Sequence, residues 1–543
     1  MQALKLPATS PSASPEFTTV GGCMEWLQTV PLINVGPSHG RLLSELEELN
    51  SCEIPASERL KILETLLEPI LFVQSEHAKK FSSRAVPLAK QEREILLSVM
   101  ALWHALGVGY QHCMQSIGSA ATGLLAGSGQ LALVSQRAVW CASQILQEHY
   151  KCYLDVAPSD WALLHSLYAF AEERKLSGDP VDHPVHKSSD KTSCMDAYAQ
   201  ALMLNTANPN EQTSRQLSIA ARWLELWGHK IMISAKRPTA KKDVEVGARP
   251  LTADIAGNGA PFRAEPSDAR ASLRFLEVND LSNSIRKRVA LLRKGDNPAS
   301  LGLGEDLASQ FAEQLLLQLH RLWCEDKQSR AVPRKSASGK SDLILGMSSL
   351  HFHVTGRPFR QPSSNAELSK TQHEEIATFG RIATRDEDDF SKNQLAAIES
   401  WQIIDESIAG LRLERVSGQN RYVHAQLVAA RPADSKVYML GTIRWLAVDA
   451  NYVAKLGVRL LPGIPRGIAI RATGINAMND RYLPAMALSA VPALKSPESL
   501  VLPVGWFKPQ RVIDVFDEQS RPLRMTGVLD RGTDFERVSF EPA

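Results

Sequence analysis

Apolar residues recur at three- and four-residue spacing over the first part of the chain, from about Arg41 to Ile233. This spacing places apolar side chains on one face of an α-helix. It predicts an α-helical domain over residues 36–234, arranged as a bundle or an irregular solenoid of antiparallel helices, with no fixed repeat motif. The stretches that carry the pattern are RLLSELEEL, ERLKILETLLEPILFVQ, EREILLSVMALWHALGVGYQHCM, QRAVWCASQILQEHYKCYL, SDWALLHSLYAFAEE and SRQLSIAARWLELWGHKIMI.

The period changes to two in the last third of the chain. Short segments with alternating apolar and polar residues are separated by Gly and Pro, which is typical of an antiparallel β-barrel. We expect this barrel over residues 346–474, followed by a β-rich extension over residues 475–543. The alternating segments are LHFHV, SWQIIDES, GLRLERV, VHAQLVAA, KVYMLGTIRWLAV, KLGVRLL and GIAIRA.

The other parts of the chain show weaker patterns. Residues 1–35 begin with a Ser-, Pro- and Ala-rich stretch without an apolar core of signal-peptide length, which predicts a disordered lead. Residues 235–345 are a linker and mixed segment: they contain two helical stretches, and QSRAVPRKSASGKSD is expected to be a basic, polar linker. The predicted fold class is therefore an α+β multidomain protein, helical at the N-terminal end and with an antiparallel β-barrel at the C-terminal end.

Composition narrows the class of protein. With 543 residues, 44% hydrophobic and 22% charged, the chain has the composition of an ordinary globular protein of several domains. A net charge of +2 excludes a protein that coats a polyanion. Seven cysteines without a C-x-x-C pair argue against a disulfide framework and a zinc ribbon and favour a reducing cytosol. No apolar run approaches the ~20 residues of a membrane span, so we expect a soluble, cytoplasmic protein.

Several motifs that would indicate catalysis or metal binding are incomplete. Gly339-Lys340-Ser341 resembles the end of a phosphate-binding loop but lacks the preceding glycine. The histidine pairs of DPVDHPVH and LHFHV have no Cys or carboxylate partner nearby. Neither a Gly-x-Ser-x-Gly elbow nor an HExxH helix is present. The sequence therefore predicts no enzyme active site and no metal site.

A polar pair at the end of one predicted strand needs an explanation. Alternation along SWQIIDES places Asp405 and Ser407 on the face that Trp401 and Ile403 occupy. A carboxylate turned toward the apolar side of a strand costs several kcal/mol unless it accepts hydrogen bonds. Guanine offers suitable donors on its ring N–H and its amino group, so this strand end suits a purine ligand.

Two arginines and a glycine complete the pattern. Arg381 and Arg385 precede the strand, and a guanidinium can fork onto the O6/N7 edge of guanine, pair with a phosphate or stack on a purine. Gly410 follows Ser407 by three residues, and without a Cβ it lets another backbone or a ligand approach closely.

Arg381-Ile-Ala-Thr-Arg385 followed by Asp405-Glu-Ser407-Ile-Ala-Gly410 resembles the RxxxR and D/N-x-S-x-x-G motifs of PilZ domains, bacterial receptors for cyclic di-GMP. The resemblance covers about the last third of the chain and implies a six-stranded barrel whose arginine arm wraps the ligand. By motif, it assigns Arg381 and Arg385 to guanine and phosphate contacts, and Asp405, Ser407 and Gly410 to the strand side of the site. Many family members have a second glycine where this chain has alanine before Gly410.

The resemblance implies a non-enzymatic cyclic di-GMP effector without a cofactor. It would signal to an unidentified protein partner through its helical region, and the family's outputs are biofilm formation, type IV pili, attachment and motility. The acidic residues 386–389 beside the second arginine would compete with the ligand in the free protein. The arm over residues 357–400 is therefore expected to be mobile before binding and to close over the barrel.

A second interpretation remains open. Arg381 and Arg385 could pair with their acidic neighbours on a solvated loop, and Asp405 could cap a turn. The chain would then be a helical scaffold with a degenerate PilZ barrel that binds no nucleotide.

Overall fold

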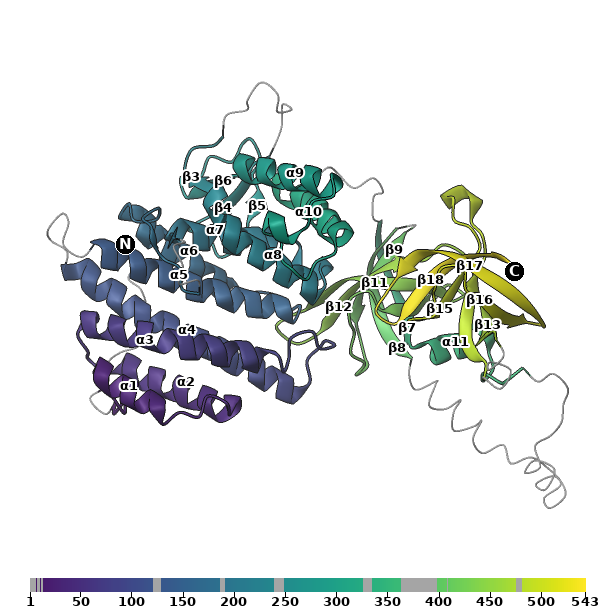
Figure 1. Ribbon diagram of the computed structural model, residues 1–543, viewed down its shortest axis with the longest axis horizontal. Coiled ribbons are helices and arrows are strands. Elements are labelled where there is room, and N and C mark those ends of the chain that lie inside the picture. Colours follow the sequence, from purple (N-terminus) through teal and green to yellow (C-terminus); the bar gives the residue numbers. More distant parts are fainter. Residues whose placement is uncertain are drawn as a thin grey trace, which may run out of the picture. The chain divides into compact units, whose positions relative to one another are not determined.

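The computed structural model divides the chain into two compact units (Figure 1). Unit 1 comprises residues 1–84 and 88–329, and unit 2 comprises residues 85–87 and 330–543. The fold class is confirmed: helices dominate the first unit and antiparallel barrels the second. The structure describes residues 6, 10, 13–120, 128–185, 191–238, 249–325, 335–362, 398–407, 409–474 and 481–543.

Unit 1 is built mainly from helices that pack side by side around one continuous apolar core. The six stretches with helical spacing all form helices, which confirms that part of the sequence prediction. The helices are α1 (Val20–Gln28), α2 (Val35–Ser51), α3 (Ala56–Ala78), α4 (Lys90–Ala120), α5 (Ser128–Lys151), α6 (Pro158–Glu173), α7 (Cys194–Thr206), α8 (Ser214–Trp227), α9 (Asn279–Arg293) and α10 (Ser309–Cys324).

Two of these helices were missed by the sequence analysis. Helix α7 begins with a capping box made by Ser193 and Asp196 and is buried on nearly every side, so it has no polar face to reveal a helical period. Helix α1 lies within the segment expected to be a disordered lead. Its two glycines weaken the helical signal, and burial of Cys23 and Trp26 in the core stabilises it instead.

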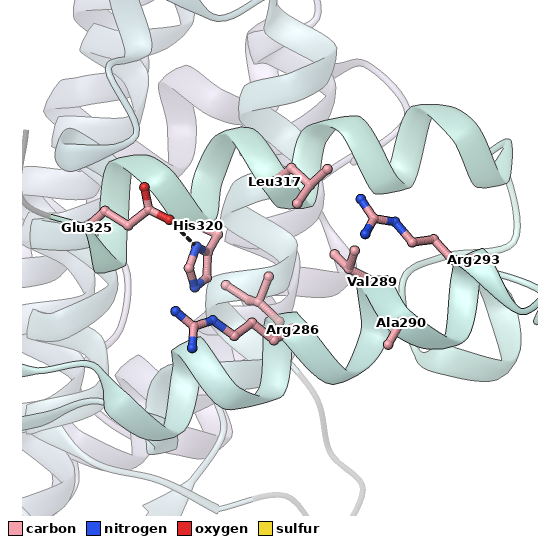
Figure 2. A pocket seen from close by; sticks show the side chains of 8 residues that line it. Arg286, Val289, Ala290, Arg293, Leu317, His320 and Glu325 are labelled. Atoms are coloured by element: carbon pink, nitrogen blue, oxygen red, sulfur yellow. Dashed lines mark hydrogen bonds and ion pairs between the residues drawn. The ribbon is translucent and has the colours of Figure 1, made fainter. Parts of the chain in front are cut away.

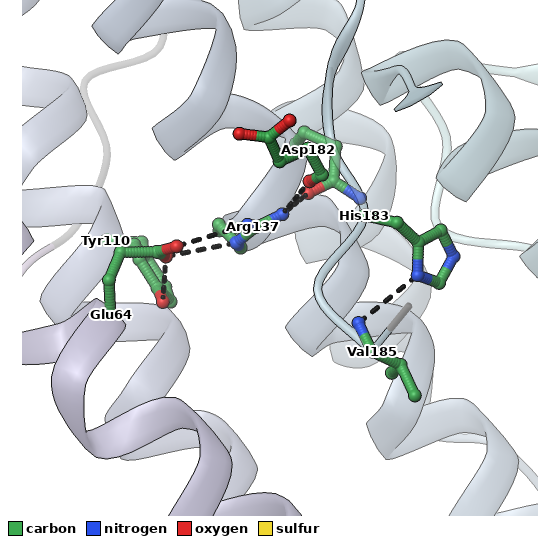
Figure 3. Close-up of polar contacts among 7 residues, drawn as sticks. Glu64, Tyr110, Arg137, Asp182, His183 and Val185 are labelled. Atoms are coloured by element: carbon green, nitrogen blue, oxygen red, sulfur yellow. Dashed lines mark hydrogen bonds and ion pairs between the residues drawn. The ribbon is translucent and has the colours of Figure 1, made fainter. Parts of the chain in front are cut away.

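An ion pair between a buried arginine and a partly exposed glutamate connects three of the helices (Figure 3). Arg137 of α5 is 2% exposed, and its guanidinium donates two hydrogen bonds to the Glu64 carboxylate of α3, at 3.0 and 3.1 Å. The Tyr110 hydroxyl of α4 donates to the same carboxylate at 2.7 Å. The remaining guanidinium nitrogen donates to the Asp182 carbonyl at 2.9 Å and to Gln136. Each of the three guanidinium nitrogens therefore donates at least one hydrogen bond, which indicates a structural role.

Small sheets complete unit 1. A four-stranded antiparallel sheet has the order β3-β6-β4-β5, and β1 pairs with β2 as a hairpin. The segment expected to be a linker and mixed region thus contains an ordered sheet as well as α9 and α10. The strands are β1 (Val181–Asp182), β2 (Lys191–Thr192), β3 (Met232–Ser234), β4 (Leu251–Asp254), β5 (Phe262–Arg263) and β6 (Leu273–Glu277).

Unit 2 contains two closed six-stranded barrels. The first has the strand order β10-β11-β12-β9-β8-β7 and the second β13-β14-β15-β18-β17-β16. Helix α11 (Met347–Thr355) and residues of both barrels share one apolar cluster. The strands are β7 (Lys335–Leu345), β8 (Glu399–Ser407), β9 (Gly410–Arg415), β10 (Leu427–Pro432), β11 (Met439–Val448), β12 (Ala454–Leu460), β13 (Pro465–Ala472), β14 (Leu483–Leu488), β15 (Ser499–Pro503), β16 (Val512–Asp517), β17 (Gln519–Arg531) and β18 (Phe535–Pro542).

Three details differ from the pattern-based expectation. LHFHV lies in helix α11 and not in a strand, and Leu350 of this helix packs in the apolar cluster that both barrels share. The polar stretch KSASGKSD belongs to β7. This strand is hydrogen-bonded to β8 on one side and to β10 on the other, and these backbone bonds stabilise it without an alternating apolar pattern. GIAIRA forms β13 of the second barrel, so the first barrel ends at β12.

Candidate functional site

The structure brings three of the predicted site residues to the tip of one hairpin. Ser407 at the end of β8 lies opposite Gly410 at the start of β9, and Asp405 lies opposite Arg412. The Asp405 side chain is 17% exposed, whereas the Glu406 side chain is exposed, as the predicted alternation requires. The polar motif therefore occupies the less exposed face of β8, close to the β8–β9 turn.

A row of residues crosses the barrel from this strand. Asp405 of β8 pairs in register with Arg412 of β9, which lies opposite Gly457 of β12, which in turn lies opposite Trp445 of β11. The Arg412 guanidinium is 3.8 Å from the Asp405 carboxylate and 5.3 Å from the centre of the Trp445 ring. A Cβ on Gly457 would lie 3.0 Å from the Cβ of Trp445, so the glycine leaves room between guanidinium and indole. We call these four residues the cross-strand row.

The cross-strand row has the chemistry to hold a planar nitrogen heterocycle. It presents an acceptor carboxylate, an arginine side chain that is 45% exposed and a half-buried indole on neighbouring strands. Purines stack on indole and guanidinium faces, and their ring N–H groups donate to carboxylates. The sequence analysis missed Arg412 and Trp445. Arg412 could have been found from the sequence, because it is a charged residue between two apolar ones, Leu411 and Leu413, which are both buried.

Gly410 has a packing reason that is independent of any ligand. A Cβ at this position would lie 2.4 Å from the carbonyl oxygen of Val458 on β12. Next to it, the Leu460 N–H donates to the Ala409 carbonyl at 2.9 Å, and the Ser407 hydroxyl reaches the Gly410 carbonyl at 3.4 Å. The sequence left open whether another backbone or a ligand approaches Gly410. The structure shows another backbone, that of β12, in this place.

Arg381 and Arg385 lie outside the described residues, as do the acidic residues 386–389. The chain enters that segment from a position anchored on the second barrel. The Gln361 side-chain amide donates to the Tyr482 carbonyl at 2.9 Å and accepts from the Tyr482 N–H at 2.8 Å, as a neighbouring strand would. Gln361 thus lies next to the start of β14.

The opposite end of β8 holds a buried polar cluster. The Glu399 carboxylate is 4% exposed and accepts hydrogen bonds from the Tyr422 hydroxyl and, at 2.6 Å, from the Asn420 N–H. Arg415 lies 3.7 Å from the same carboxylate, and its guanidinium lies over the rings of Trp401 and Tyr422. Burial, reinforced by the bond to Glu399, raises the pKa of Tyr422, so its hydroxyl keeps its proton and stays a donor.

This cluster fixes a short segment from elsewhere in the chain. Val86 and Tyr422 exchange two backbone hydrogen bonds, at 2.8 and 2.7 Å. The Arg421 guanidinium also donates twice to the Ala85 carbonyl. Residues 85–87, which follow α3 and precede α4 in the sequence, therefore belong to the barrel unit.

The described histidines of the two pairs make contacts within the protein. His351 lies edge-on to Phe359 at 5.2 Å, and His353 lies beside Tyr438 at 5.7 Å. The His183 ring nitrogen accepts from the Val185 N–H at 3.2 Å, while His186 lies outside the described residues (Figure 3). Among the described residues, no group of three or more His, Cys, Asp or Glu side chains could hold a metal ion. None of the helices in the described part of the chain combines the length and the hydropathy that a membrane span requires.

Models of three domain families match the chain. The N-terminal domain of the cyclic-di-GMP receptor FimW matches residues 21–239, the FimW middle PilZ domain matches residues 260–394, and the FimW C-terminal β-barrel domain matches residues 468–543. The PilZ match includes β7, α11 and the RxxxR positions, and it ends before β8. The C-terminal match corresponds to the second barrel.

Individual proteins show the same relationship. The cyclic-di-GMP receptor FimW of Pseudomonas aeruginosa is 22% identical over 560 aligned residues, which cover 95% of this chain and 90% of that protein. A solved structure of MrkH, described as a c-di-GMP-dependent transcription regulatory factor, aligns with 40% of this chain and 91% of its own chain, at 7% identity and a TM-score of 0.12. That score is too low to support an argument about the fold.

Proposed function

This chain is a PilZ-domain protein with matches to all three FimW domain models, and from that premise we propose that it is a cyclic di-GMP effector. Cyclic di-GMP is the ligand of the receptor family. In our proposal the protein binds the nucleotide without converting it, and the change is passed to a protein partner through the helical unit. The expected setting is the cytoplasm, and the expected outputs are biofilm formation, type IV pili, attachment or motility.

The observation that carries the proposal is the cross-strand row beside the D-x-S-x-x-G hairpin. Asp405 can accept hydrogen bonds from a guanine edge while Trp445 and Arg412 offer faces for stacking. Arg381 and Arg385 would close over the nucleotide from the other side and neutralise its two phosphates. Ser407 would contribute a hydroxyl at the turn, and Gly410 would act indirectly by letting β12 approach.

A route for the signal follows from the two ends of β8. One end carries Asp405, and the other carries Glu399, whose carboxylate holds the Tyr422 hydroxyl. Tyr422 in turn holds Val86 through two backbone hydrogen bonds. Because β8 is a single strand, a shift at its ligand end would reach the segment that joins α3 to α4.

Titration calorimetry on the full chain tests the binding proposal. We expect cyclic di-GMP to bind far more tightly than GTP or cyclic AMP. Arg381→Ala, Arg385→Ala and Asp405→Ala should each weaken binding, since loss of one charge-assisted bond costs on the order of 1.5–3 kcal/mol. Arg431→Ala is the matched control, because this arginine pairs with Asp342 on the same barrel but outside the cross-strand row.

Two results would contradict the proposal. Absence of heat and of a thermal shift at high micromolar cyclic di-GMP would favour the scaffold with a degenerate barrel. Equal affinity of the wild-type chain and the Arg381→Ala and Arg385→Ala variants would place the site elsewhere. If cyclic di-GMP does bind, hydrogen exchange over residues 357–400, measured with and without the nucleotide, tests whether this arm closes on binding.

A further inference from the structure

A groove of about 520 Å³ lies between helices α9 and α10 of unit 1 (Figure 2). Val289 and Ala290 of α9 and Leu317 of α10 give it an apolar floor, and Arg286 and Arg293 stand at its two ends. Val289 is 5% exposed, whereas the two arginine side chains are exposed. The groove therefore combines a short apolar surface with a cation at each end.

The two arginines differ in their surroundings. Within the part of the chain that the structure describes, no hydrogen bond or ion pair occupies the Arg286 guanidinium. Burial and the nearby Arg286 charge lower the pKa of His320, which keeps this ring neutral at physiological pH. At the other end, the Arg293 guanidinium donates to Glu313 at 2.7 Å. Arg286 is thus the stronger attachment point for an incoming carboxylate.

The charge of α9 as a whole is strongly one-sided. Its sequence, NDLSNSIRKRVALLR, contains four arginine or lysine residues and one aspartate, and Lys294 follows directly. Such a helix attracts acidic partners over a distance of about 8 Å in physiological salt.

The spacing of the arginines defines the ligand. Arg286 and Arg293 are seven residues apart, which is about 10.5 Å along a helix axis and close to two full turns. A partner helix that lies along the groove has the same rise, so acidic residues seven apart on it face the two guanidinium groups together. Apolar side chains three or four positions after the first acidic residue then meet Val289 and Leu317.

We propose that the α9–α10 groove is the docking site for an acidic amphipathic helix of a protein partner. A nucleic acid or an anionic lipid headgroup fits less well, because a phosphate has no apolar side chain to place against Val289 and Leu317 on the groove floor. The inference rests on the proposed function only in that the partner would receive the cyclic di-GMP signal. Docking of the helix itself requires no cyclic di-GMP.

A designed helix tests the groove on the full-length chain without nucleotide. The probe is a lactam-bridged, fluorescent peptide with glutamates at its fourth and eleventh positions and leucine and alanine at its seventh and eighth. Fluorescence anisotropy should show salt-sensitive binding. The double variant Arg286→Glu/Arg293→Glu should weaken it by about tenfold or more, which equals at least 1.4 kcal/mol.

The chain offers a matched control in and directly after the same helix. Lys287 and Lys294 have the same charge and the same seven-residue spacing but do not line the groove. The variant Lys287→Glu/Lys294→Glu should therefore change affinity by less than about threefold, an effect of long-range attraction only. A peptide with lysine in place of the two glutamates should bind the arginine double variant better than the wild type. Circular dichroism melting curves verify that each variant is folded.

Several outcomes would overturn the proposal. One is failure of the glutamate peptide to bind the wild type, and another is an equal loss of affinity for it in the two double variants. Tighter binding of a DNA duplex or of anionic vesicles through the same two arginines would also overturn it. Self-association that disappears only in the arginine double variant would assign the groove to a second copy of the chain. None of these results bears on cyclic di-GMP binding, which calorimetry measures separately.

Discussion

Replacing Gly410 with alanine separates the two roles that this residue could have. The new Cβ would lie 2.4 Å from the carbonyl oxygen of Val458, where ordinary contact begins at 3.4 Å. The backbone of β12 would have to move by about 1 Å, because a main-chain oxygen cannot rotate away as a side chain can. Overpacking of this kind costs about 1–3 kcal/mol.

Gly339→Ala is the matched control on the same barrel. The nearest atom to a Cβ there, Cδ1 of Ile403, is 4.0 Å away, so no displacement is needed. Alanine also restricts the unfolded chain, which makes this variant neutral or more stable by about 0.4–1 kcal/mol. Differential scanning calorimetry of the full chain should show the barrel transition of Gly410→Ala lowered by about 2–10 °C.

Hydrogen exchange and nucleotide titration complete the comparison. Peptides from β9 and β12 should exchange faster in Gly410→Ala and at the wild-type rate in Gly339→Ala. Any loss of cyclic di-GMP affinity in Gly410→Ala should accompany the loss of stability. The reasoning would be refuted if Gly410→Ala melted within about 1 °C of the wild type but no longer bound nucleotide, because the glycine would then serve the ligand directly.

Three further predictions concern buried polar groups. Burial lowers the pKa of His77 and of His112 to about 4, so as the pH falls from about 6.5 to about 4 the unfolded state takes up protons first. Calorimetry should therefore show that the unfolding temperature of the helical unit falls in that pH window. An unfolding temperature that stays the same between pH 7 and pH 4.5 would contradict this prediction. Arg137→Met leaves the partly exposed Glu64 carboxylate without its guanidinium and should destabilise unit 1 by about 1.5–3 kcal/mol in urea unfolding. A loss below about 0.5 kcal/mol would contradict the structural role. Tyr422→Phe removes the hydroxyl donor at the end of β8 and should speed hydrogen exchange in the segment paired with it while cyclic di-GMP affinity stays unchanged; equal exchange rates would argue against the signal route.

The amino-acid sequence alone determined the elements whose two faces differ in polarity. The amphipathic helices of unit 1 and the strands β8 to β13 were predicted from the spacing of their apolar residues, whereas β14 to β18 were expected only as a β-rich extension. The same alternation placed Asp405 and Ser407 together on one side of β8, and the structure has them there. Local pattern sufficed in these cases because the neighbours concerned are close in the sequence.

Only the tertiary structure decided the features that depend on residues far apart in the chain. Helix α7 was hidden because burial on all sides removes the period on which sequence analysis depends. β7 is a strand because two other strands hydrogen-bond to it, although its own residues are largely polar. The alternating LHFHV is helical because it packs on an apolar cluster shared by both barrels.

The candidate site divides in the same way. The sequence supplies the carboxylate of Asp405, but the register of four strands places Arg412 and Trp445 beside it, and no local pattern encodes a register. Likewise, the sequence shows that Gly410 has no Cβ, but only the position of Val458 reveals what occupies that space. The sequence determines which chemical groups are present, whereas closure of the barrel determines which groups from distant strands come into contact.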